Sequence, residues 1–196
     1  MEDIIQLKIT LEYTKPAIWR RVRVKKQTTF FELHHIIQIT FGWQNYHVYE
    51  FFIDNHKLGA PDDYLKNVPS TDEGVIDARD IALDSLIVQP RETFKYEYDF
   101  GDSWMHRIVV ERFLPKEEFM EYPYCMSGKY SCPPEDCGGI SGYYDMLKIL
   151  KDKKHPDYKE TLKWAGKNFD PVYFDKERVN KKLLHLDKYI HNWLNS

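Results

Sequence analysis

Residues 93–111 constrain the fold more than any other segment, because they consist of two segments of alternating apolar and polar residues separated by one short polar turn. The apolar positions of one parity are Phe94, Tyr96, Tyr98 and Phe100 before the turn and Trp104, His106, Ile108 and Val110 after it. This alternation predicts a hairpin of two half-buried strands. A turn at 101–103 puts both sets on one face and pairs Tyr98 with His106, so we expect that register in preference to a two-residue turn. Gly101 is expected to supply the positive φ of the turn.

Other segments carry equally local signals. Alternation predicts strands over 4–12, 17–24 and 47–53, although Arg20 breaks the pattern of the second. A capping box that begins at Thr29 and a glycine at position 42 delimit a helix between them. A short strand within 83–88 is also expected. Three helices are predicted after residue 140, and the apolar stripe of each is expected to pack on the sheet. The third helix would begin at an N-cap at Asp175. The stripes are Tyr143, Met146, Leu147 and Leu150 in the first helix, Tyr158, Leu162 and Ala165 in the second, and Val179, Leu183, Leu186, Ile190 and Trp193 in the third.

The order of these elements predicts an α+β fold. We expect a mixed or antiparallel sheet with one N-terminal helix against it, in a β-grasp-like layout, followed by a C-terminal helical annex. A length of 196 residues suits a single domain over 1–196. Within it, 1–112 would form the sheet-and-helix body, 113–140 a loop rich in Cys, Pro and Gly, and 141–196 the annex.

Composition excludes several classes of protein. With 42% hydrophobic and 15% aromatic residues, the chain can bury a core, which excludes wholesale disorder. No apolar run approaches the ~18 residues of a membrane span, and the acidic start lacks the charge order of a signal peptide. Three cysteines, an odd number, favour a reducing cytoplasm over a disulfide framework. The motifs of phosphate loops, dinucleotide folds, zinc proteases and serine hydrolases are missing from the sequence.

The turn of the hairpin carries the first candidates for chemistry. Asp99, Asp102 and His106 lie close in sequence, and folding could bring Glu135 and Asp136 near them. Carboxylates with an imidazole suit a divalent metal ion or acid–base catalysis. The structural alternative is that the aspartates cap the turn and that His106 is a core residue stacked on an aromatic ring.

The three cysteines are a second candidate site. Cys125, Cys132 and Cys137 lie in the loop rich in Pro and Gly, where thiolates could hold zinc with His106 as a fourth ligand. The spacing lacks the paired Cys-x2-Cys of common zinc sites. The alternative is three buried thiols in a rigid loop.

Two adjacent histidines on the predicted helix, His34 and His35, are interpreted as structural. Neighbouring helical residues point about 100° apart, so they do not easily chelate one ion. His34 lies beside the apolar stripe, and His35 is expected to face solvent.

One parity of the second strand forms a basic and aromatic stripe. Its members are Trp19, Arg21, Arg23 and Lys25. Such a stripe can stack bases and neutralise phosphates, which makes nucleic acid a candidate partner. The alternative is a solvated face whose arginines pair with the acidic segment 54–84. Residues 1–140 carry a net charge of −7 and residues 141–196 a net charge of +4, so the acidic body disfavours nonspecific nucleic-acid binding.

Several specific motifs resemble one known family. They are PAIWRRV at 16–22, YEYDFGDSWMH at 96–106 and CPPEDCGGISGY at 132–143, with Phe169-Asp170-Pro171 in agreement near the end. On these motifs the chain is identified as a member of the Ri-plasmid Orf3-like family over nearly its whole length. The resemblance implies a compact α+β domain found on plasmids, in chromosomes and in transposons, and it brings no established reaction or catalytic residue. Some relatives carry a transposon-resolvase label, but the N-terminal strand lacks the serine that a serine recombinase needs.

The leading functional hypothesis is a cytoplasmic, non-enzymatic interaction or accessory module with a link to mobile elements. It would bind a protein partner through the stripe of Trp19, Arg21, Arg23 and Lys25 (the Trp19 stripe) or through the loop that begins with Cys132-Pro133-Pro134 (the Cys-Pro-Pro loop), since Trp, Tyr and Arg are common in binding surfaces. The alternative is a metal-dependent hydrolase or nuclease-like enzyme that uses the Asp99 region, and nucleic-acid binding is the third hypothesis. The enzyme hypothesis requires the carboxylates to converge within reach of one ion in a cleft.

Overall fold

The computed structural model describes residues 3–59 and 74–195. The strands in these ranges are β1 (Ile4–Leu11), β2 (Trp19–Lys25), β3 (Tyr49–Ile53), β4 (His56–Gly59), β5 (Val75–Asp77), β6 (Thr93–Tyr98), β7 (Trp104–Leu114) and β8 (Tyr124–Lys129). They form one sheet in the order β5-β4-β3-β6-β7-β1-β2-β8. Neighbouring strands are antiparallel except for β4 and β5, which are parallel. The sheet is therefore mixed, as predicted.

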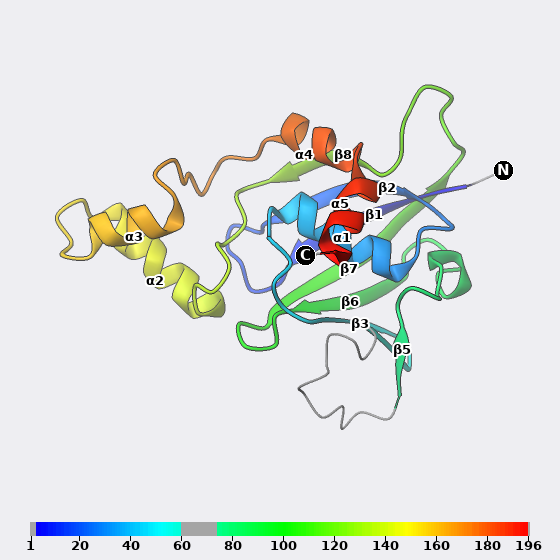
Figure 1. Cartoon of the computed structure of the whole chain (residues 1–196), viewed down its shortest axis with the longest axis horizontal. Helices are drawn as coiled ribbons and strands as arrows, with labels where there is room; N and C mark the ends of the chain where they lie inside the picture. Colours follow the sequence, from blue (N-terminus) through cyan, green and yellow to red (C-terminus); the bar gives the residue numbers. More distant parts are fainter. Residues whose placement is uncertain (1–2, 60–73, 196) are drawn as a thin grey trace.

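Helices lie on one side of the sheet and at one end of it. Those in the described residues are α1 (Phe30–Phe41), the 3-10 turn η1 (Leu83–Ser85), α2 (Gly139–Lys151), α3 (Tyr158–Ala165), α4 (Lys176–Leu183) and α5 (Leu186–Leu194). Figure 1 shows α1 and α5 in front of the sheet, α4 beside β8, and α2 and α3 together at one end. The α+β class is confirmed. None of the described helices is both long and apolar enough to cross a membrane.

The first helix begins and ends where the sequence predicts. The side chain of Thr29 accepts a hydrogen bond from Glu32 N, and the Glu32 carboxylate accepts one from Thr29 N, which completes the capping box. At the other end Gly42 adopts a φ of 89°, and its N–H donates to Gln38 O. The bounds of α1 thus follow from local signals alone.

His34 and His35 lie fully buried between the sheet and α5. His34 forms hydrogen bonds with the Tyr96 hydroxyl and the Asn45 side chain, and His35 packs against Trp193 of α5. The expectation that His35 faces solvent is wrong, because α5 covers that side of α1. Burial lowers the pKa of His34 and takes the pKa of His35 to about 3, so both rings are neutral at pH 7.

Arg20, which breaks the alternation of β2, is only 2% exposed and is fully engaged in hydrogen bonds. It donates from Nε to Thr40 O (2.7 Å), from Nη1 to Lys129 O (3.0 Å) and from Nη2 to Tyr130 O (2.9 Å). The guanidinium carbon lies 4.0 Å from the ring centroid of Phe174. Arg20 therefore ties together the end of α1, the end of β8 and the segment before α4.

The 93–111 hairpin forms with the predicted buried face but in a different register. Tyr98 pairs with Trp104 and Tyr96 with His106, so both registers that we considered are wrong. The true register differs by two residues from the preferred one, and a shift of two keeps every side chain on its own face. Burial of the apolar parity was therefore predictable except at Phe100, which lies in the turn and is 48% exposed, whereas the exact partners were not.

Three other segments differ from the prediction. Residues 83–85 form η1 instead of a strand, segment 113–140 contains β8, and the helix expected from Asp175 is divided into α4 and α5. β8 includes Ser127 and Gly128, which are weak strand formers, so pairing with β2 makes it a strand. The N-cap at Asp175 is confirmed, since its side chain accepts from Arg178 N. The acidic segment 54–84 contains β4 and β5, and its residues 60–73 lie outside the described part of the chain.

At Cys125 the backbone on the outer edge of β8 is satisfied by one side chain of α4, Asn180. Asn180 Oδ1 accepts from Cys125 N (2.7 Å), and Asn180 Nδ2 donates to Cys125 O (3.0 Å). We expect Asn180→Ala to lower the free energy of unfolding by ~2 kcal/mol, because it leaves two buried backbone groups unpaired. Urea denaturation checks this, with the exposed Asn192→Ala as a control that should change stability by less than ~0.5 kcal/mol. Equal effects of the two changes would show that the edge contact is unimportant.

Candidate metal centre

The turn at 99–103 holds one carboxylate rigidly. Asp99 and Ser103 adopt positive φ values of 58° and 51°, whereas Gly101, for which we expected one, does not. Asp99 Oδ1 accepts from the N–H groups of Gly101 (3.0 Å) and Asp102 (3.4 Å). Aspartate tolerates the left-handed conformation because it can bond to the following backbone in this way. One oxygen of Asp99 therefore caps the turn, and Oδ2 is left for another partner.

The Cys-Pro-Pro loop, residues 132–138, docks on this hairpin through Glu135. The Tyr98 hydroxyl donates to Glu135 Oε1 (2.5 Å), and the backbone N–H of Gln44 donates to Glu135 Oε2 (2.7 Å). Burial, together with the hydrogen bond to Glu135, raises the pKa of Tyr98, so it remains a neutral phenol that can donate. Glu135 thus joins three segments: the loop, β6 and the residues after α1.

Asp102 joins the hairpin turn to the start of α2. Its Oδ2 accepts from Gly138 N (3.1 Å), at the helix N-terminus, where a carboxylate is favoured by the helix dipole. A Cβ at position 139 would lie 2.6 Å from Asp102 O, and Gly139 has a φ of 64°. The close approach of α2 to the turn therefore requires glycine at this position.

Together these loops bring two aspartates to His47; we call His47, Asp99 and Asp136 the His47 cluster. His47 Nε2 lies 3.0 Å from Asp136 Oδ1 and 3.6 Å from Asp99 Oδ2. One ligand atom from each residue lies within 4.8 Å of the others. The nitrogen is shielded from solvent, and neither contact has the geometry of a hydrogen bond. One imidazole and two carboxylates at this separation match a ligand set for Mn²⁺, Fe²⁺ or Zn²⁺.

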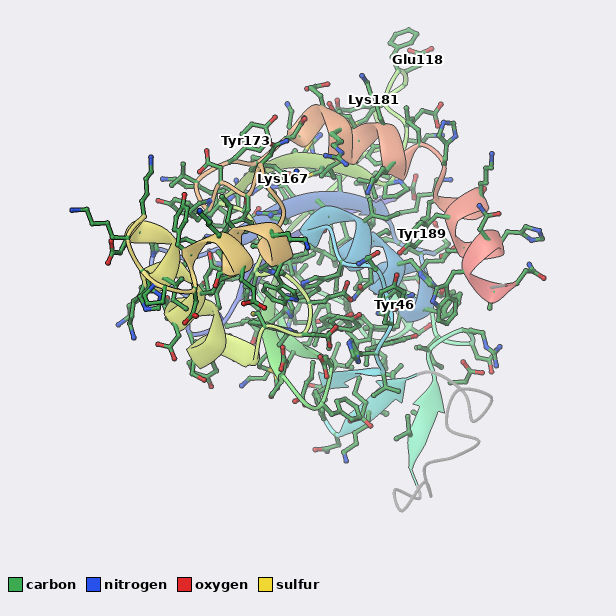
Figure 2. The ribbon with its side chains drawn as sticks, turned by 60° about the vertical axis from the view of Figure 1, so that its left-hand side comes forward. Tyr46, Glu118, Lys167, Tyr173, Lys181 and Tyr189 are labelled. Carbon is green, nitrogen blue, oxygen red and sulfur yellow. The ribbon has the colours of Figure 1, made fainter. Side chains whose placement is uncertain are left out.

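A cleft of about 450 Å³ opens beside the His47 cluster. Asp136 belongs to both, and the lining near it includes Glu135, Gln44, Tyr46 and Trp164. Tyr46, labelled in Figure 2, lies in the segment between α1 and β3, and both its ring and that of Trp164 are exposed. A molecule in this cleft would therefore have access to the exposed carboxylate of the cluster.

The structure divides the five predicted catalytic residues into three groups. Asp99 and Asp136 join the His47 cluster. Asp102 and Glu135 lie next to it, but each holds backbone or hydroxyl donors that position the loops. His106 takes no part in the cluster.

His106 is a core histidine. Its side chain is fully buried, its Nδ1–H donates to Trp104 O (2.9 Å), and its ring packs edge-on against Phe41 and Trp43. Burial takes its pKa to about 3, so the ring is neutral. His106 therefore lies outside the cluster and has the surroundings that the alternative of a core histidine predicts.

The cysteines do not form the four-ligand zinc group that we considered. Cys125, Cys132 and Cys137 are free thiols, and the potential metal-binding group found in the described residues contains none of them. Burial raises the pKa of Cys132 and takes those of Cys125 and Cys137 to about 11 and about 12. Protonated thiols are poor metal ligands and nucleophiles.

Sequence reasoning missed His47. The residue reads as the start of strand 47–53, but β3 begins at Tyr49 and leaves His47 in the preceding loop. Pairing of Tyr49 with Tyr98, extended by the hydrogen bond from Asp99 N to Val48 O, then brings this loop against the hairpin turn. No local sequence pattern predicts the contact between the His47 loop and the hairpin turn, because the two segments are about fifty residues apart in the sequence.

The Trp19 stripe lies on the sheet face opposite α1, and its arginines are paired. Arg21 donates to both carboxylate oxygens of Glu111 on β7, at 2.6 and 2.8 Å, and Arg23 forms an ion pair with Glu117. The expected partners in segment 54–84 are thus replaced by residues of β7 and the loop after it. This pairing reduces the positive charge available for nucleic acid. Lys25 is exposed.

Comparison with known proteins places the chain in a family. The family model described as plasmid pRiA4b ORF-3-like protein matches residues 3–178. The chain belongs to this family. The resemblance inferred from the three motifs is therefore confirmed.

Two similar members illustrate the ORF-3-like family. The uncharacterized protein y4hQ of Sinorhizobium fredii (strain NBRC 101917 / NGR234) is 36% identical over 181 residues, which cover 91% of this chain and 90% of that protein. The crystal structure of MM3350 from Methanosarcina mazei Go1, a protein of unknown function, is similar with a TM-score of 0.78 and 36% identity, and the match covers 89% of this chain and 96% of that one. Function in this ORF-3-like protein must therefore be argued from its own site.

Proposed function

We propose that this ORF-3-like protein is a divalent-metal-dependent hydrolase whose metal ion is held by His47, Asp99 and Asp136. One observation carries the proposal: a shielded imidazole nitrogen, without a hydrogen bond, lies 3.0 and 3.6 Å from oxygens of two carboxylates. A neutral imidazole and two carboxylates would give the ion one nitrogen and two oxygen ligands. The proposal takes up the alternative inferred from the sequence, with His47 in the place of His106.

Three protein ligands leave open coordination positions for water and substrate. A bound divalent ion can lower the pKa of its water to about 7, which supplies a hydroxide nucleophile at neutral pH. The exposed side of Asp136 faces the 450 Å³ cleft, and a substrate bound there would approach the ion from that side. The reaction class that this arrangement favours is hydrolysis of an ester or phosphoester.

The surroundings of the His47 cluster support the proposal because they hold the ligands in place. Asp99 is fixed by its own turn, and Asp136 follows Glu135, which two donors anchor. Asp102 holds the far end of the same loop through Gly138. Ligands positioned by such contacts lose little freedom when an ion binds, which favours affinity.

The second candidate function is the cytoplasmic interaction module with a link to mobile elements. In that case the His47 cluster is only a polar contact between the imidazole and two aspartates. Trp19 lies on the sheet face opposite α1, with Lys8 and Arg21 beside its ring. Because Trp and Arg are common in the residues that dominate binding surfaces, this arrangement favours the interaction module. The two candidates differ in metal binding, so one titration separates them.

We expect the purified protein to bind one Mn²⁺ or Zn²⁺ per chain in isothermal titration calorimetry. Asp136→Asn and His47→Gln should each weaken binding at least about tenfold, because each removes one of three ligands. Asp145→Asn is the matched control, since Asp145 and Asp136 have equal side-chain exposure, 66%. This control should bind metal as the unchanged protein does.

The metal-loaded protein should also hydrolyse para-nitrophenyl acetate or bis-para-nitrophenyl phosphate, and Asp136→Asn should abolish that activity. Failure to bind either ion, or equal binding by the Asp136→Asn and Asp145→Asn variants, would contradict the metal site and favour the interaction module. Metal binding without hydrolysis of either ester would retain the site and contradict the reaction class.

A further inference from the structure

A second cavity, of about 520 Å³, lies at the end of the sheet that carries α2 and α3; it contains none of the His47 cluster residues and shares Phe169 with the cleft beside them. We call it the α2–α3 groove; its lining includes Ile18, Tyr143, Leu147, Leu150, Tyr158, Leu162, Phe169 and Val172. Figure 1 shows α2 and α3 side by side at this end, and Lys167 and Tyr173, labelled in Figure 2, mark the connection to α4 that passes it. The proposed hydrolase function makes no use of this groove.

The apolar side of α3 is only partly covered by the rest of the protein. No residue of α3 is fully buried, and of the predicted stripe only Ala165 packs against the core, so the expectation that the stripe packs on the sheet is wrong for Tyr158 and Leu162. Tyr158 and Leu162 line the α2–α3 groove instead, opposite Leu147 and Leu150 of α2. An amphipathic helix normally buries its apolar side, so this geometry leaves room for an apolar occupant.

The charges around the groove have one sign. Lys15, Lys148 and Lys151 are part of its lining, which includes no aspartate or glutamate. Lys148 forms an exposed ion pair with Asp145, one turn away on α2. In the described part of the chain, neither Lys15 nor Lys151 has a carboxylate within ion-pair distance. The net charge of +4 over residues 141–196 has the same sign.

We infer that the α2–α3 groove binds a small amphiphile with an apolar body and one anionic head group. Volumes of about 300–1,000 Å³ are typical of small-molecule sites, and an apolar lining with a few charged groups is their usual composition. The apolar walls would hold the body, and Lys15 and Lys151 would attract the head group. A linear carboxylate such as decanoate has this chemistry.

Isothermal titration with decanoate, below its micelle concentration, tests the inference on the full chain. One decanoate should bind per chain, and decanol, which has the same chain and no charge, should bind about tenfold more weakly. Val172→Asp should weaken decanoate binding at least about tenfold, because it places a like charge in the apolar lining. The matched control is Val88→Asp, since Val88 is 71% exposed and Val172 is 67% exposed.

Circular dichroism should show that both variants fold, because both positions lie at the surface. No decanoate binding, or equal loss in Val172→Asp and Val88→Asp, would overturn the inference. Equal affinities for decanoate and decanol would overturn the role of the lysines. These outcomes are independent of metal binding, since the groove and the His47 cluster share no residue.

Discussion

Replacing Arg20 with methionine is expected to lower the free energy of unfolding by ~3–5 kcal/mol. Methionine has similar bulk but cannot donate, so the carbonyl oxygens of Thr40, Lys129 and Tyr130 would lose their buried donors. The contact between the guanidinium and Phe174 would also be lost. Urea denaturation monitored by tryptophan fluorescence measures the change.

Arg21→Met is the control for this prediction, because Arg21 lies on the same strand with its side chain on the open face. Its ion pair with Glu111 is partly exposed, so we expect its loss to cost less than ~1 kcal/mol. Similar losses in the two variants would show that the carbonyl contacts of Arg20 contribute no special stability. Burial takes the pKa of Arg20 to about 10, so the group remains charged throughout the measurement at neutral pH.

Acidification from pH 7 to pH 5.5 is expected to lower the free energy of unfolding by ~4 kcal/mol through His34, His35 and His106. Burial lowers the pKa of all three rings, to about 3 for His35 and His106, whereas an unfolded histidine titrates near 6.5. Between these values the unfolded chain binds a proton at each position and the folded protein does not. Stability is therefore complete above about pH 6.5 and falls with decreasing pH, by ~1.4 kcal/mol per pH unit for each ring.

Urea denaturation at several pH values between 7 and 5.5 measures this slope. His35→Phe keeps an aromatic ring against Trp193 and Tyr189 and removes one titrating group, so it should reduce the slope by about one third. His191→Gln, on the exposed side of α5, should leave the slope unchanged. A free energy of unfolding that stays constant down to pH 5.5 would contradict the assignment of three neutral buried histidines.

The parts of the fold that sequence reasoning predicted depend on short-range patterns. The capping box at Thr29 and the glycine at 42 set the ends of α1, and the period of two in 93–111 selects the buried face of the hairpin. These signals act between residues a few positions apart, so they can be recognised in one sequence without knowledge of the tertiary structure. The family motifs can be recognised for the same reason.

Other features required contacts between distant segments. The hairpin register depends on the turn at 99–103, which contacts the Cys-Pro-Pro loop through Asp102 and Gly138. β8 is a strand because it pairs with β2 and because Asn180 satisfies the backbone of Cys125. Arg20 contradicts the pattern of its strand because carbonyl groups from two other parts of the chain, the end of α1 and residues 129–130, converge on it. A periodic pattern cannot show such convergence.

The candidate site follows the same division. The sequence by itself determined the α+β class, the family and two of the three residues of the His47 cluster, because Asp99 and Asp136 lie in polar motifs that stand out locally. Only the tertiary structure decided that His106 belongs to the core and that His47 takes its place beside the aspartates. The physical reason is that the two histidines have the same chemistry, and burial, set by strand pairing, separates their roles.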